Sequence, residues 1–157
     1  MDALRLLAEW PVAAALRRSE LLYPVVNAAH ILGIGLLVGA IFTLDLRVTG
    51  AFRRAPLAVL GPPLVRMATI GLGLAVATGF LLFSVRPQDY AANPAFLVKL
   101  SFIAAGLLNV LLLRLGTGWQ RALAGGPVTA PVRMAAVVSM LIWMSAVLAG
   151  RWIAFVE

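Results

Sequence analysis

The sequence predicts an all-α fold, a four-helix transmembrane bundle that runs up-down-up-down behind a short amphipathic helix. Hydrophobic residues make up 62% of the chain and charged residues 12%, and the mean hydropathy is +1.00, far from soluble averages. A soluble fold of 157 residues buries only about two-thirds of its surface, so lipid must cover the rest. In addition, four apolar segments each reach the length of about 20 residues that spans a bilayer.

The first element, residues 1–20, is predicted to lie in the membrane interface. Its apolar residues fall on one broad half of a helix, opposite Glu9 and Arg17, which is typical of an interfacial helix. Pro11 is expected to divide this stretch, and with Asp2 and Glu9 it interrupts the apolar core that a cleavable signal would need.

The transmembrane domain, residues 21–157, is expected to contain spans at about 22–48, 63–85, 95–115 and 131–155. The three separators are short and collect Gly, Pro and charge, which end helices and turn chains. Short separators make successive helices antiparallel neighbours.

Basic residues give the chain a net charge of +7, but they sit at helix ends and not on one stripe, so we expect no nucleic acid partner. The side of the first and third loops carries seven of them, and the terminal side six, one of which is Lys99 inside a helix. By the positive-inside rule both termini are predicted to lie outside the cytoplasm, and the membrane is predicted to be a bacterial inner membrane. Asp45 is the only acid counted on the loop side.

Small residues recur at four-residue spacing, at Gly35 and Gly39 in the first span and at Gly71, Ala75 and Gly79 in the second. This spacing lets helix backbones approach closely in lipid. We interpret both sets as helix-packing positions.

Polar groups inside the spans are the first place to look for function, because each is costly in hydrocarbon. His30 lies about 12 Å and Lys99 about 6 Å from the terminal side, at 1.5 Å per residue, so the two share a leaflet. Asn27 shares a face with His30, one turn away. In the last span Ser139, Trp143, Ala146 and Gly150 form a face with one large ring among small residues, which leaves space for a flat ligand.

Each of these residues has a structural and a functional interpretation. His30, the only histidine, would be a haem or metal ligand, a proton carrier or a hydrogen-bonded packing residue. Lys99 would pair an anion or extend its charge to the interface, and Asn109 is typical of an interhelical hydrogen bond. Met140 and Met144 offer sulfur to copper or haem but are also ordinary core residues. Without Cys there is no disulfide, thiolate metal site or covalent haem attachment.

The run AAHILGIGLLVGAIFTLDLRV, 28–48, resembles the first helix of the HemJ-type protoporphyrinogen oxidases and the CopD-type copper-resistance proteins, with His30 and Gly39 at matching positions. The run FLVKLSFIAAGLLNVLLLRL, 96–115, is similar to the Lys-Leu helix of that family and places its lysine on Lys99. Asn27, Leu37 and Asn109 stand where the HemJ type usually has lysine, tryptophan and histidine. The resemblance thus implies a diverged relative that keeps the scaffold.

The function that follows is binding of a b-type haem or related porphyrin, for electron transfer in the membrane. His30 would be the axial ligand, Lys99 or Arg151 would pair a propionate, and Asn27 and Trp143 would line the site. The alternatives are porphyrinogen oxidation, which would make the chain an enzyme, copper handling through His30, and a cofactor-free accessory subunit that assembles through Gly35 and Gly39. The expected partners are the bilayer, a second copy of the chain or a membrane redox protein.

Overall fold

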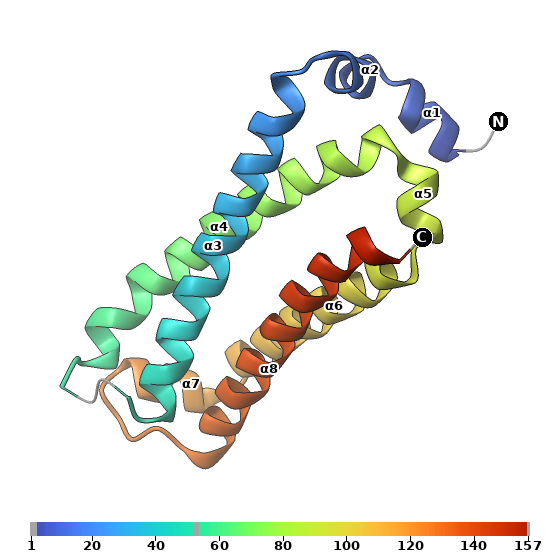
Figure 1. Ribbon diagram of the computed structural model, residues 1–157. Helices are drawn as coiled ribbons and strands as arrows, with labels where there is room; N and C mark the ends of the chain where they lie inside the picture. Colours follow the sequence, from blue (N-terminus) through green and yellow to red (C-terminus); the bar gives the residue numbers. More distant parts are fainter. Residues whose placement is uncertain (1–2, 52–53, 157) are drawn as a thin grey trace.

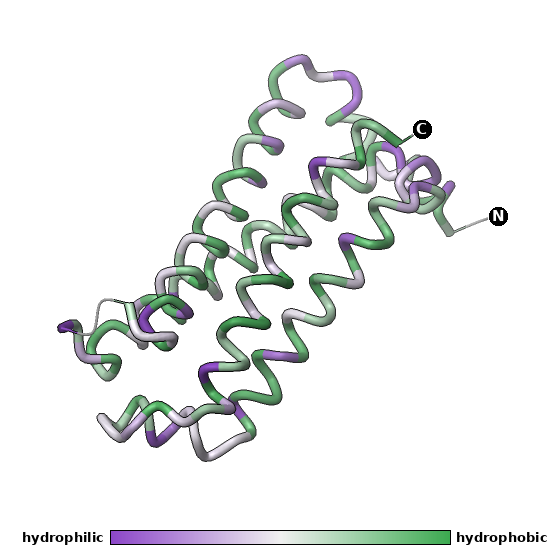
Figure 2. The backbone as a smooth tube through the Cα atoms, turned by 60° about the horizontal axis from the view of Figure 1, so that its bottom comes forward, coloured by the Kyte–Doolittle hydropathy of each residue, from purple (hydrophilic) through white to green (hydrophobic). Residues whose placement is uncertain are grey.

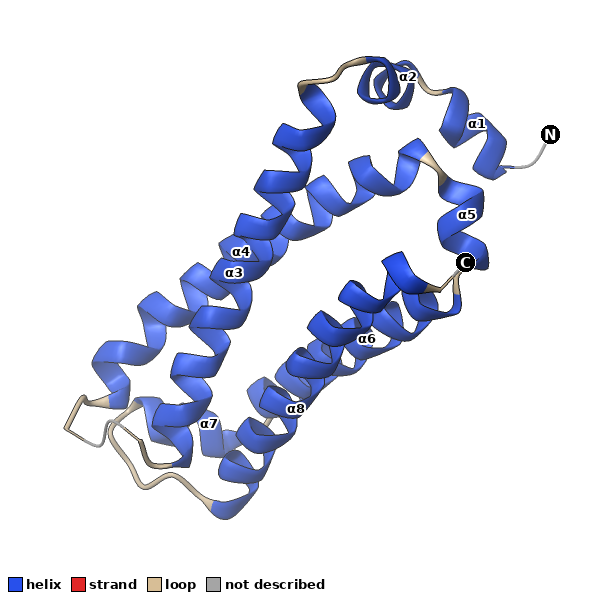
Figure 3. Ribbon diagram, viewed as in Figure 1, coloured by secondary structure: helices blue, strands red, loops and turns tan. Residues whose placement is uncertain are grey.

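The computed structural model describes residues 3–51 and 54–156, and they form the predicted helical bundle (Figures 1 and 3). The four long helices are α3 (Leu22–Thr49), α4 (Leu57–Val85), α6 (Pro94–Leu115) and α8 (Ala130–Trp152), the last continued by a 3-10 turn at Ile153–Phe155. Each is long and apolar enough to cross a membrane. Asp2, Arg53 and Glu157, which entered the charge comparison, lie outside the described residues.

The helices are arranged as two pairs that separate toward the end of the molecule where both termini lie (Figure 1). Helix α3 packs along α4, and α6 packs along α8. Among the described residues of the four spanning helices, only α3 and α8 bring Cα atoms of the two pairs within 8 Å of each other. Helices α4 and α6 make no such approach to each other, although side chains of both, Leu72 and Ile103, pack against the same core cluster.

The closest helix contact is a crossing of α3 and α4 at Gly33 and Gly71. A Cβ atom added at Gly71 would lie 2.5 Å from the backbone nitrogen of Leu37, and one added at Gly33 would lie 2.8 Å from that of Ala75. Nothing in the chain lies within 4 Å of a Cβ added at Gly35 or Gly39. The sequence interpretation was therefore right for Gly71 and Ala75 but wrong for Gly35 and Gly39, because the first span is rotated to turn Gly33 toward its neighbour.

The second span begins at Leu57, earlier than the predicted residue 63. The predicted span began at Pro63, with Pro62 in the separator before it, but both prolines lie inside the helix. Two separators also contain short helices, α5 (Pro87–Ala92) on the terminal side and α7 (Thr117–Leu123) on the loop side. Helix α7 buries Trp119 against both pairs, so it closes the loop end of the bundle.

The predicted interfacial segment forms two helices, α1 (Ala3–Glu9) and α2 (Pro11–Arg18), with the break at Pro11 as expected. They lie across the terminal end of the bundle (Figure 1). Arg17 fixes them there, because its guanidinium donates to the carbonyl oxygens of Ala8 and of Val85 at the end of α4. Figure 2 shows hydrophilic residues gathered near the ends of the long helices and mainly hydrophobic residues between them, as a bilayer requires.

Candidate functional site

The single histidine lies on the face of α3 that packs against α4, in the half of the helix nearer its N-terminus, and its imidazole is half-buried. His30 Nδ1 lies 3.0 Å from the hydroxyl oxygen of Thr78. That hydroxyl has one proton, which it donates over 2.6 Å to the carbonyl oxygen of Leu74. In the tautomer in which Thr78 accepts from His30, Nδ1 carries the proton of the neutral ring and Nε2 carries the lone pair that a ligand nitrogen needs.

Gly79 provides the room that the imidazole occupies. A Cβ atom added at Gly79 would lie 2.9 Å from His30 Cε1, closer than such contacts allow. The small-residue row of α4 thus serves two purposes, because Gly71 and Ala75 admit the α3 backbone and Gly79 admits the histidine ring. Sequence spacing alone assigned all three to helix packing.

Lys99 faces the histidine from the other helix pair. Its aliphatic stem packs on Gly150 of α8, whose added Cβ would lie 3.5 Å from Lys99 Cδ, and the side chain is half-buried. The ammonium group lies within electrostatic range of the His30 ring. Lys99, on α6, and His30, on α3, thus come from different helix pairs, and their sharing a leaflet stays a prediction.

The other three predicted site residues are placed differently. Asn27 and Arg151 are exposed near the terminal end, and the Arg151 guanidinium lies 5.1 Å from the centre of the Phe155 ring. Trp143 is 3% exposed and packs in the core with Leu37 and Ile41, two turns along α3 from His30. Its ring fills the space above Gly106, so the burial of Trp143 is that of a core residue.

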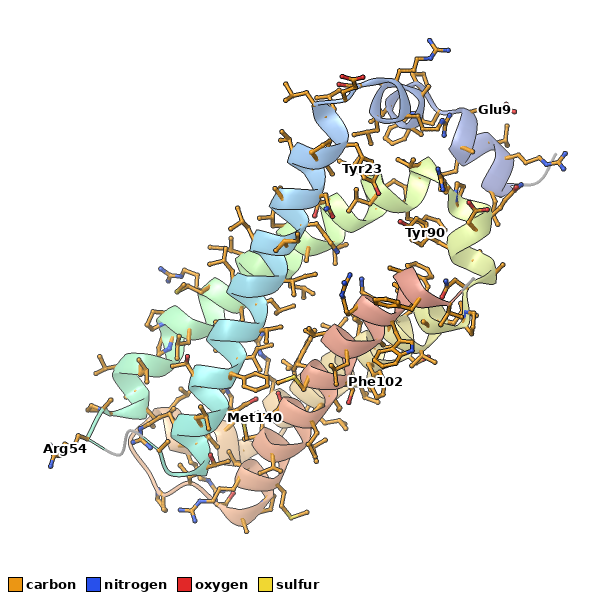
Figure 4. The ribbon with its side chains drawn as sticks, in the orientation of Figure 1. Glu9, Tyr23, Arg54, Tyr90, Phe102 and Met140 are labelled. Carbon is orange, nitrogen blue, oxygen red and sulfur yellow. The ribbon has the colours of Figure 1, made fainter. Side chains whose placement is uncertain are left out.

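Aromatic residues lie near the terminal end of the bundle, and Figure 4 shows Tyr23 and Tyr90 pointing toward each other. The two phenols share a hydrogen bond. The centre of the Tyr90 ring also lies 5.5 Å from that of Phe96, whose ring stacks on Phe83. Burial raises the pKa of the Tyr90 phenol above its ordinary value, and the neighbouring Tyr23 raises it further.

Two residues with a clear place in the structure were not assigned to a site from the sequence. Thr78 was noted only as an intramembrane polar residue, although it holds the histidine. Asp45 was counted as a loop-side charge, but it lies within α3 and is 8% exposed. Its four-residue spacing from Ile41 and eight-residue spacing from Leu37 mark the buried face and could have shown this.

Other polar predictions are also resolved. Asn109 forms the expected interhelical hydrogen bond, because its amide nitrogen donates over 3.0 Å to the carbonyl oxygen of Ala135. Within residues 3–51 and 54–156, no three His, Cys, Asp or Glu side chains gather in a group that could hold a metal ion.

The fold and these buried polar positions define a small integral membrane protein with four apolar helices. The chain belongs to DUF6644, a family of unknown function, whose family model matches residues 21–156. No curated protein matches the sequence, and no solved structure matches it.

Proposed function

We propose that this membrane protein binds a b-type haem or a related porphyrin through Nε2 of His30, between its two helix pairs, and serves electron transfer in the membrane. The observation that carries the proposal is the hydrogen bond from His30 Nδ1 to Thr78. A ligating histidine commonly donates its second ring nitrogen in this way, which fixes the tautomer and the ring orientation. A packing histidine does not require that Nε2 remain the acceptor.

The surrounding residues fit the chemistry of a porphyrin. Among the described residues of the spanning helices, α3 and α8 alone bring Cα atoms of the two pairs within 8 Å of each other, and aromatic rings lie near the terminal end. Lys99 supplies a cation within electrostatic range of His30, suited to a propionate carboxylate. Arg151 provides a second cation nearer the surface. Bound haem iron would supply one-electron chemistry, while the protein supplies the nitrogen donor, the apolar surroundings and the charge pairing.

The resemblance to HemJ-type and CopD-type proteins supports the same position, since it places a histidine at residue 30 and a lysine at residue 99. We favour a binding role over porphyrinogen oxidation, because Asn27 and Asn109 stand in place of the family's lysine and second histidine. In addition, the Asn109 amide is engaged with the Ala135 carbonyl.

The test is a haem titration of the detergent-purified protein, followed by its absorption spectrum. Wild type is expected to give a saturable Soret band. His30→Ala is expected to lose it, because the ligand nitrogen is gone. Lys99→Ala is expected to bind about tenfold more weakly, since it loses one charge-assisted contact. The exposed Arg5→Ala is the matched control for loss of a charge. A wild-type protein that takes up no haem contradicts the proposal, and copper found by metal analysis would favour the copper-handling alternative.

A further inference from the structure

A cavity lies in the loop-side half of the bundle, far from His30. Its volume is about 120 Å³, and all four spanning helices and α7 contribute to its walls. Most of its lining is apolar, including Leu37, Ile41, Leu72 and Val110. Asp45, which also lines it, follows His30 by 15 residues along α3, or roughly 22 Å at 1.5 Å per residue. The cavity is therefore independent of the proposed haem site.

Two of the residues that line this cavity each carry a buried polar atom without a hydrogen-bond partner. The two atoms are Oδ2 of Asp45 and Nε1 of Trp143, and their residues are 8% and 3% exposed. Within residues 3–51 and 54–156, no other buried side-chain nitrogen or oxygen is left in this state. An unpaired buried polar group is costly. Two such groups on one cavity indicate a ligand that satisfies both.

The two residues lie on α3 and α8, which pack against each other. Asp45 faces the hydroxyl of Ser139 on α8, and Trp143 follows Ser139 by one helical turn. Residues at this spacing have Cβ atoms about 5 to 6 Å apart on one helix face. A ligand the width of a single ring would span that distance.

The chemistry of the two groups selects a hydroxyl. The indole N–H needs an acceptor, and the carboxyl group needs a hydrogen-bonding partner of its own. An ammonium group would satisfy only Asp45, since it has no lone pair, and it would be repelled by Arg114, which also lines the cavity. A hydroxyl oxygen both accepts and donates. In size the cavity approaches the roughly 150 Å³ apolar cavity that holds a benzene ring in another protein.

Such a ligand would enter between α4 and α6. Helices α4 and α6 do not approach within 8 Å at any Cα in the described chain, and each contributes an exposed residue to the cavity, Thr69 and Leu107. In a membrane this side faces lipid. A ligand that arrives by this route must be lipid-soluble.

We propose that this cavity binds a lipid-soluble molecule with a ring-sized, hydroxyl-bearing head group, of phenol or quinol type. Its hydroxyl pairs with Asp45 and Trp143, and its ring lies among the apolar residues. The bound ligand gives both buried polar atoms a hydrogen-bond partner and lies between α4 and α6.

The test uses phenol as the probe and benzene as its matched control without a hydroxyl. Protein labelled with 5-fluorotryptophan in lipid nanodiscs is titrated and followed by fluorine NMR. Phenol is expected to shift the signals of Trp143 and Trp119, which line the cavity, and to leave Trp10 and Trp152 unchanged. Benzene is expected to bind at least tenfold more weakly. Asp45→Asn should weaken phenol binding by about tenfold, whereas Asp89→Asn, on the exposed part of α5, should not.

Equal affinities for phenol and benzene would overturn the proposal, because they would show an apolar void that accepts any ring or acyl chain. Unmoved Trp143 and Trp119 signals would overturn it as well. If Asp45→Asn fails to fold, Trp143→Phe removes the indole donor instead, and Trp119 then reports the loss of phenol affinity. Phenol affinity unchanged in a folded Trp143→Phe protein would also contradict the assignment.

Discussion

Adding one methyl group at Gly71 should destabilise the bundle, because the α3 and α4 backbones meet there. The added Cβ would lie 2.5 Å from Leu37 N and 2.8 Å from Gly33 O. Both are backbone atoms, so no side-chain rotation relieves the contact. To reach an ordinary separation of 3.4 Å the helices must move apart by about 0.9 Å. Overpacking of this kind costs about 1 to 3 kcal/mol.

Gly73→Ala is the matched control, since nothing lies within 4 Å of a Cβ added there. Replacing glycine by alanine in a helix favours folding by about 0.5 to 1 kcal/mol. Both variants share this gain, so the free energies of unfolding of Gly71→Ala and Gly73→Ala should differ by the overpacking cost alone, about 1 to 3 kcal/mol. The measurement is unfolding in mixed micelles with increasing denaturing detergent, followed by circular dichroism. Equal midpoints for the two variants would refute the close crossing at Gly71.

The remaining predictions concern orientation, a terminal tyrosine and the histidine support. A reporter fused to the C-terminus should be active only outside the cytoplasm, and one in the α3–α4 loop or in α7 only inside; the reverse pattern would contradict the charge argument. The free energy of unfolding should fall above about pH 10, because unfolded tyrosine ionises near its ordinary pKa of 10.0 while folded Tyr90 keeps its proton to a higher pH. Tyr90→Phe should lose this part of the pH dependence. Identical pH profiles of wild type and Tyr90→Phe would exclude a contribution from Tyr90. Thr78→Val should weaken haem binding by about 10-fold to 100-fold, as expected for loss of an outer-shell partner, whereas the exposed Thr69→Val should leave it unchanged.

The sequence predicted the spans well because apolar length is a strong signal, and three of the four helix starts lie within one residue of expectation. The exception is α4, which was expected to begin at Pro63 and begins at Leu57. Proline can mark a first turn or lie within a helix, and only packing distinguishes the two. The depths of His30 and Lys99 follow from a constant rise per residue and stay a prediction.

Helix rotation was the part that the sequence left open. A row of small residues shows that some face packs closely but not which row meets which neighbour, so the spacing selected Gly35 and Gly39 for packing and not Gly33. Gly39→Leu, which the spacing predicts to be disruptive, should have little effect because nothing in the chain lies within 4 Å of a Cβ added at Gly39. Trp143 lies in the core with Leu37 and Ile41.

The most direct test of the account is resonance Raman spectroscopy of the haem-loaded, ferrous protein with and without ¹⁵N-histidine. His30 is the only histidine, so the label reports on one residue and requires no mutation. The account predicts an iron–histidine stretching band that shifts on labelling, because Nε2 of His30 is bound to the iron. Bound haem whose low-frequency bands do not respond to the label would contradict the central claim.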